Sequence, residues 1–182
     1  MELAAILDSL KANDAVTAVE GAGHDVVVRV RLPGLRDLLS KLKGAGFNML
    51  VDFTAVDRLK LPDRDPRFEV TYRLMALDLE SGLIQARLAV KARVAEGQPI
   101  PHTAMDLWPS ADWTEREVWD MFGIPVADRP GIKRLLLYEE FKGHALRKDY
   151  PINKRQPLIG PKSGERENNP SFNAEVPTVT VD

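Results

Sequence analysis

Apolar side chains recur at helical spacing in two segments of the first 98 residues and at strand spacing in five. The helical segments are residues 2–13 and 35–43, and Gly44 ends the second. The strand segments are residues 16–19, 26–32, 48–56, 68–77 and 83–94. Because helices and strands do not alternate regularly, this order predicts an α+β fold. We expect a two-layer domain with a mixed sheet, in the order helix, two strands, helix, three strands.

The connections and one strand face carry further information. Residues 57–67 hold two prolines and alternating charges, which is typical of an exposed, mobile loop. Residues 80–82, Glu-Ser-Gly, predict a hairpin turn. On the last strand, Arg87, Lys91 and Arg93 share one face with an alanine. We expect that face to be in contact with water or covered by a partner.

Three parts are predicted along the chain. Residues 1–98 form the α+β core domain, and residues 99–151 add a helical region that packs on it. Periodicity stops after Pro151, and residues 151–182 carry five of the thirteen prolines. Seven apolar side chains remain in this last part: Ile152, Leu158, Ile159, Phe172, Val176, Val179 and Val181. We therefore expect residues 152–182 to be an extended tail that binds a partner and becomes ordered only in an assembly.

Composition excludes several classes of protein. The 182 residues are 44% apolar and 29% charged, and the net charge of −2 gives no field that would recruit nucleic acid. The absence of cysteine excludes disulfides and thiolate-held iron–sulfur clusters in this chain. No apolar run approaches the roughly 20 residues that span a bilayer, and residues 1–8 lack the basic start of a secretory signal. We expect a cytoplasmic chain that meets a membrane only through a partner.

One helix-sized segment combines charged and large apolar side chains at high density: Trp113-Thr-Glu-Arg-Glu-Val-Trp-Asp-Met-Phe-Gly-Ile124. A helical wheel places its valine, methionine, phenylalanine and second tryptophan on one face. Arg116, Glu117 and Asp120 fall on the opposite face, where Arg116 and Asp120 are four residues apart and can pair.

Glu115 falls inside the apolar arc of this helix. A buried carboxylate needs a partner, because its burial alone costs several kcal/mol. Glu115 is therefore either a general acid or one half of a structural ion pair. We favour the ion pair, with a cation from Arg129, Lys133 or Arg134.

The rest of the sequence offers little catalytic chemistry. Residues 142–155 hold five basic side chains against one acid, Asp149. This run fits phosphate, an acidic protein partner or a solvated face, and we favour the acidic partner. It is too short and too poor in aromatic side chains for nucleic-acid binding. His24, His102 and His144 lack the spacing of a metal site. The glycines at 21 and 23 are a fragment of a dinucleotide fingerprint with no helix after them. We expect no catalytic, cofactor or metal site in this chain.

Three motifs together identify a family. Glu115-Arg-Glu-x-x-Asp-Met-Phe-Gly-Ile124, then Arg134-Leu-Leu, then Phe141-x-Gly-His-x-Leu-Arg-Lys-Asp-Tyr-Pro151 resemble the 30 kDa subunit family of NADH:quinone oxidoreductase, respiratory complex I. Arg129 stands where the family usually has His, and Lys133 replaces the first of a paired Arg-Arg. The signature residues expected to serve structure or an interface are Glu115, Arg116, Glu117, Asp120, Arg134, His144, Arg147, Lys148 and Asp149.

The resemblance implies a non-redox structural subunit of the hydrophilic arm of a proton-translocating enzyme. That enzyme moves electrons from NADH through flavin and iron–sulfur centres to quinone, and these cofactors sit in partner subunits. The implied partners are the hydrogenase-large-subunit-like chain of the quinone site and the iron–sulfur subunits. The implied location is peripheral, on the cytoplasmic side of the membrane. The alternatives are the equivalent subunit of a membrane-bound hydrogenase or ferredoxin-linked complex, and, more distantly, a free-standing acid–base enzyme using Glu115 and His144.

Overall fold

The computed structural model contains one five-stranded sheet and describes residues 3–21, 26–129, 131–154 and 156. The strands lie in the order β1 (Val16–Glu20), β2 (Val26–Val30), β5 (Ile84–Val94), β4 (Phe68–Leu77) and β3 (Met49–Asp57). β2 and β5 are parallel, whereas the other neighbours are antiparallel. The predicted α+β fold with a mixed sheet is therefore confirmed.

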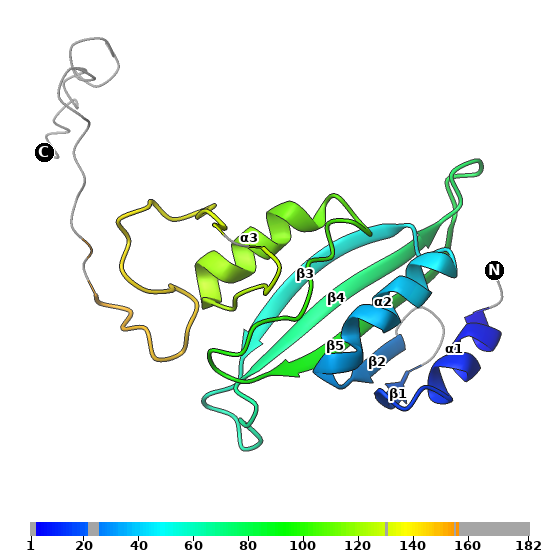
Figure 1. Ribbon diagram of the computed structural model, residues 1–182, viewed down its shortest axis with the longest axis horizontal. Helices are drawn as coiled ribbons and strands as arrows, with labels where there is room; N and C mark the ends of the chain where they lie inside the picture. Colours follow the sequence, from blue (N-terminus) through cyan, green and yellow to red (C-terminus); the bar gives the residue numbers. More distant parts are fainter. Residues whose placement is uncertain (1–2, 22–25, 130, 155, 157–182) are drawn as a thin grey trace, which may run out of the picture. The chain divides into compact units, whose positions relative to one another are not determined.

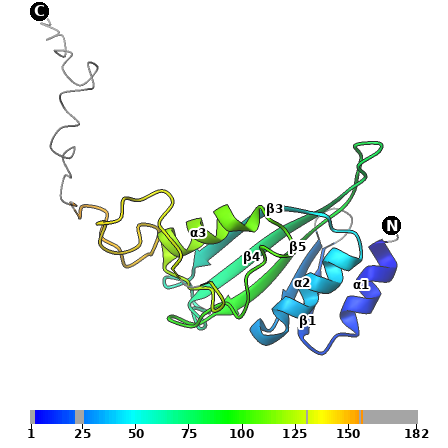
Figure 2. The same cartoon turned by 45° about the horizontal axis from the view of Figure 1, so that its top comes forward.

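Helices cover one face of this sheet (Figures 1 and 2). α2 (Leu35–Gly44) follows a short 3-10 helix, η1 (Leu32–Gly34), and α3 (Ala111–Phe122) lies beside it over the strands. α1 (Leu3–Lys11) lies next to β1. The leucine stripe of α2 is buried, as its helical spacing predicts.

The core forms between this helical layer and the inward positions of the strands. On β4 these positions are Phe68, Val70, Tyr72 and Leu74, which alternate with side chains of the opposite face. The Tyr72 ring stacks on Phe53 of β3 with 4.3 Å between ring centroids. In the part of the chain that is described, no helix covers the opposite face, which antiparallel sheets commonly leave to solvent or to a partner.

Three expectations need correction. The strand expected over residues 26–32 ends at Val30, because Pro33 sits in η1 and cannot donate to the sheet. Residues 99–151 were expected to be mostly helical, but α3 is the one α-helix among those that are described there. The loop over residues 57–67 is exposed from residue 60 to residue 65, as expected, but its two end residues, Asp57 and Arg67, are buried.

The chain divides after Ile152. Met1–Ile152 form one compact unit and Asn153–Asp182 a second. The predicted tail lies almost wholly outside the described residues, so its extended, partner-binding form stays a prediction. Among the described helices, none has the length and apolar character needed to cross a membrane.

Candidate functional site: the signature segment and its buried ion pairs

Glu115 lies in the middle of α3 and is only 1% exposed. Its carboxylate accepts hydrogen bonds from the backbone N of Ala104 at 2.7 Å and from the Thr103 hydroxyl at 2.8 Å. Arg129 Nη1 donates to the same carboxylate at 3.0 Å, and the Arg129 guanidinium also pairs with Asp112. The expected ion pair with a cation of residues 129–134 is therefore present. It fixes α3 to the segments before and after it.

Asp120, one turn further along α3, is fully buried. Its Oδ2 accepts three backbone N–H groups, from Leu135 at 3.1 Å and from Leu136 and Leu137 at 2.9 Å each. Its Oδ1 accepts Arg134 Nη1 at 2.6 Å. Successive backbone N–H groups that converge in this way form an anion-binding nest. Here the bound anion is a side chain of the same protein.

Electrostatics agree with this geometry. Burial alone would raise the pKa of the Asp120 carboxyl, but the hydrogen bonds from Leu137, Arg134 and Leu136 outweigh it, so the pKa lies below its usual range. Asp120 is therefore ionised at neutral pH.

The expected pair between Arg116 and Asp120 is not made. Arg116 instead donates to the backbone carbonyls of Lys133 and Arg134, the latter at 2.8 Å. The helical wheel assigned both residues to a polar face, and that face is polar. Residues 133–137 cover part of this face and form hydrogen bonds with both Arg116 and Asp120. The Glu117 carboxylate stays exposed and makes no hydrogen bond or ion pair with any described residue.

A second cluster centres on Arg67, which the sequence did not single out. Its guanidinium donates to Asp57 at 2.8 and 3.1 Å, to Glu96 at 2.9 and 3.0 Å, and to Asp149 at 2.7 and 3.1 Å. Arg147 joins the cluster through Glu96 at 2.9 Å. The cluster ties the end of the signature to the ends of β3, β4 and β5.

Asp57 is the buried acid of this second cluster. Burial raises the pKa of its carboxyl, but the hydrogen bonds from Arg67 and from the backbone N of Lys148 and Leu59 lower it to about 2. Ionised Asp57 therefore stabilises the folded state at neutral pH.

His144 packs against the C-cap of α3. Its Nδ1 lies 2.9 Å from the Asp120 carbonyl oxygen, which requires a protonated Nδ1 that donates. Burial lowers the pKa of the imidazole, and the hydrogen bond to Asp120 offsets this only in part. The C-cap residue is Gly123 at φ 70°, and a Cβ there would overlap the His144 ring and lie 2.8 Å from Arg147 Nη2. Only glycine lets the two side chains close over the helix end.

Some of the charged side chains in the basic run over residues 142–155 form contacts within the protein. Arg147 donates to the Phe122 carbonyl as well as to Glu96, and Asp149 accepts from Arg67. The Lys148 side chain is exposed while its backbone N donates to Asp57 at 2.8 Å. Whether the remaining cations bind an acidic partner stays a prediction.

Large apolar side chains remain exposed on the rigid signature segment. Trp113 is 60% exposed and Leu136 62%, and Leu146 is half exposed. Arg116 lies over the Trp113 ring at 5.3 Å from its centroid. An exposed Trp beside a half-buried Arg has the residue types that are enriched in protein–protein interfaces.

Comparison with known proteins gives the family. A family model described as "Respiratory-chain NADH dehydrogenase, 30 Kd subunit" matches residues 28–156. The chain belongs to this family. An NADH-quinone oxidoreductase subunit of Citrifermentans bemidjiense is 39% identical over 152 residues, which cover 82% of this chain and 89% of that protein. Subunit 5 of the Thermus thermophilus enzyme is 36% identical over 160 residues, 87% of this chain and 77% of that protein.

Solved structures agree with the fold of the family. A trypsin-resistant fragment of Nqo5 superimposes with a TM-score of 0.62 at 34% identity, covering 71% of this chain and 98% of the fragment. A chain of a membrane-bound sulfane sulfur reductase, an archaeal respiratory membrane complex, superimposes with a TM-score of 0.64 at 21% identity, covering 84% of this chain and 88% of that one. The second likeness concerns the fold alone.

Most signature side chains contact other segments of the same chain, but the Glu117 and Lys148 side chains are exposed. Glu115 and Asp120 each hold a distant segment, and Arg134 also donates to the Phe141 carbonyl at 2.8 Å. Among the described residues, no group of three or more side chains of the His, Cys, Asp or Glu type could hold a metal ion. Glu115 and His144 share no hydrogen-bond partner in the described network.

Proposed function

We propose that this 30 kDa family member is a non-redox structural subunit of the hydrophilic arm of NADH:quinone oxidoreductase. It positions neighbouring subunits and binds no flavin, iron–sulfur cluster or metal of its own. Its partners are the chain that forms the quinone site and the iron–sulfur subunits. It acts peripherally on the cytoplasmic side of the membrane and reaches the membrane only through the complex.

One observation carries this proposal. The carboxylate oxygens of the two buried signature acids accept hydrogen bonds from other segments of the same chain. Glu115 accepts from residues 103, 104 and 129, and Asp120 accepts from residues 134–137. An acid that transfers protons must reach a substrate, whereas these two are at most 1% exposed. Their geometry supports a rigid scaffold and argues against the acid–base enzyme.

The rigid segment presents Trp113 and Leu136 to a neighbour. Tryptophan is over-represented among the residues that carry most of the binding energy in protein interfaces. Trp113→Asp and Leu136→Asp should therefore lower the amount of this chain that co-purifies with the other subunits from its native host. The matched control is Leu79→Asp, because Leu79 is 81% exposed at the tip of the β4–β5 hairpin.

The experiment is a pull-down through an affinity tag on this chain, followed by mass spectrometry and an assay of quinone reduction by NADH. The proposal predicts that the flavin and iron–sulfur subunits co-purify with the tagged chain. It also predicts that only the complete complex reduces quinone with NADH. A tagged chain that turns over substrate alone would contradict it.

The equivalent subunit of a membrane-bound hydrogenase or ferredoxin-linked complex is the second candidate. The fold of the sulfane sulfur reductase chain leaves it open. The relatives at 36–39% identity carry the name of the NADH-dependent enzyme, which favours NADH as the donor. A pull-down that recovers a nickel-binding large subunit in place of a flavin subunit would favour the alternative.

A further inference from the structure

The sheet face that no described helix covers is rich in cations. Along β5, Arg87, Lys91 and Arg93 point to this face, since side chains alternate along a strand. Arg29 of β2 is the direct neighbour of Lys91, and Arg73 of β4 is the neighbour of the alanine between Arg87 and Lys91. Arg73 and Arg87 are exposed and make no ion pair with any described residue.

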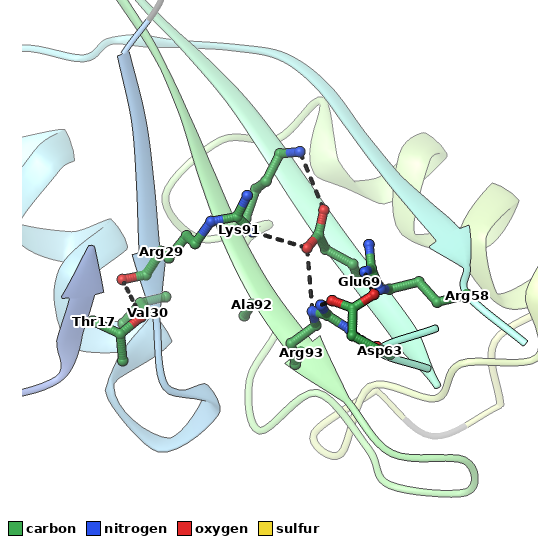
Figure 3. A pocket seen from close by; sticks show the side chains of 9 residues that line it. All are labelled: Thr17, Arg29, Val30, Arg58, Asp63, Glu69, Lys91, Ala92 and Arg93. Carbon is green, nitrogen blue, oxygen red and sulfur yellow. Dashed lines mark hydrogen bonds and ion pairs between the residues drawn. The ribbon is translucent and has the colours of Figure 1, made fainter. Parts of the chain in front are cut away.

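A pocket of about 330 Å³ lies at one end of this face, beside the loop after β3 (Figure 3). Its floor is Glu69, which is 5% exposed. The Glu69 carboxylate lies 3.1 Å from Arg29 Nη1, 3.1 Å from Lys91 Nζ and 3.3 Å from Arg93 Nε. Three cations are thus held at fixed positions around one acid, as the converging side chains in Figure 3 show.

Positive charge exceeds negative charge in this pocket. Arg58 also lines it, and its partner is Asp63, an exposed side chain of the loop. Four cations therefore meet the two carboxylates of Glu69 and Asp63. If the nearby acids Glu20 and Asp52 and the cations Arg73 and Arg87 are included, the face holds six cations and four carboxylates, in a chain whose net charge is −2. The excess of two remains.

Arg58 supplies an independent sign of an absent acceptor. Its Nε is a buried donor without a hydrogen-bond partner, and no other buried side-chain nitrogen or oxygen of the described residues is in that state. A buried donor left without an acceptor is costly. A carboxylate that enters the pocket beside Asp63 would give the Arg58 guanidinium a second acceptor.

We propose that this face docks an acidic, extended segment of a partner protein. One carboxylate of that segment enters the pocket beside Arg29, Arg58 and Lys91, and others meet Arg73 and Arg87. Lys91 and Arg87 are four residues apart on β5, or about 13 Å at the rise of a strand. A compact anion such as phosphate can enter the pocket but does not reach from Lys91 to Arg87, whereas an extended peptide does. The inference rests on the proposed function only in taking the partner to be another subunit of the complex.

Two variants test the surface in the complete complex. Arg73→Glu/Arg87→Glu reverses the two cations that lack ion pairs, so no ion pair of the folded chain is lost. Lys41→Glu, on exposed α2 surface over the opposite face, is the control charge reversal, with half the charge change of the double variant. We expect the double variant to bind the complex at least about tenfold more weakly and to leave it at lower salt than either the wild type or Lys41→Glu.

A zero-length carbodiimide cross-link identifies the occupant. In the purified complex, Lys91 Nζ should become joined to an Asp or Glu of another subunit, and the double variant should lose this product. The docking proposal is wrong if Lys91 joins only residues of its own chain, such as Glu69, or if the double variant is retained like Lys41→Glu. It is also wrong if inorganic phosphate removes the cross-link while the charge reversals leave retention unchanged, since the site would then hold a compact anion.

The outcome is separable from that of the proposed function. Trp113→Asp tests the signature surface on the other layer. If Trp113→Asp impairs assembly and the double arginine variant does not, the structural role stands and the second docking face is wrong.

Discussion

Replacing Asp120 by Asn should destabilise the folded chain more than its small chemical change suggests. The carboxylate accepts four hydrogen bonds, three from the backbone N–H groups of residues 135–137 and one from Arg134. Asn offers one carbonyl oxygen and one NH2 group. In either orientation the NH2 group faces a donor, either Arg134 Nη1 or the backbone nest, because both sides of the site donate.

The expected loss follows from what remains unpaired. Breaking a buried ion pair by neutralising one partner costs about 3–5 kcal/mol, and Arg134 is itself only 11% exposed. Asn fills the same volume, so no cavity adds to this loss. Typical domains have about 5–15 kcal/mol of stability in total. Asp120→Asn should therefore remove about a fifth or more of the free energy of unfolding.

Urea unfolding of the full chain at pH 7, followed by circular dichroism and tryptophan fluorescence, measures this loss. The matched control is Glu117→Gln, the same type of change three residues earlier on α3, where the carboxylate is exposed and unpaired among the described residues. That control should stay within about 0.5 kcal/mol of wild type. An Asp120→Asn chain that is as stable as the Glu117→Gln chain would refute the structural role of the nest.

Three further perturbations test the same network. Glu115→Ala should lower the free energy of unfolding in urea by about 3–5 kcal/mol. The double variant Glu115→Ala/Arg129→Met should lose less than the sum of the two single variants, and additive losses would show that the two side chains do not interact. Gly123→Ala places a Cβ 2.8 Å from Arg147 Nη2 and against the His144 ring at φ 70°, so the melting temperature should fall by an amount equivalent to about 1–3 kcal/mol, and an unchanged melting temperature would contradict the packing. The pKa of Asp57 falls from 3.8 to about 2 on folding, so about 2 kcal/mol of stability is present above pH 4 and is lost as the pH falls toward 2. Asp57→Asn should flatten stability across that window, and an unchanged acid slope would show that other groups cause it.

Local patterns were sufficient for the elements of the fold. Strand alternation and leucine spacing predicted all five strands and the first two helices, because each element buries one face and shows it in its own residues. The same reasoning gave Glu115 a buried partner. A carboxylate inside an apolar arc has few other outcomes, and Arg129 was among the three nearest cations.

Long-range coverage could not be predicted in the same way. The helical wheel assigned Asp120 to a polar, outward face, and the covering segment, residues 135–137, has no periodic pattern that would place it there. Arg67 and Asp57 looked like the ends of a solvated loop. Their burial depends on Asp149, which is 82 residues beyond Arg67. A wheel describes one helix, whereas ion pairs between distant segments depend on the packing of the whole chain.

Turnover per assembled complex is the measurement that tests the central claim most directly. Complexes carrying Glu115→Gln or Asp120→Asn would be purified from the native host beside the wild type, quantified by their flavin content and assayed for quinone reduction by NADH. If this chain is a non-redox scaffold, the two buried variants lower the amount of complete complex, while turnover per flavin stays equal to wild type. A variant complex that is complete in subunits and cofactors but has lost turnover would contradict this account and assign chemistry to the signature acids.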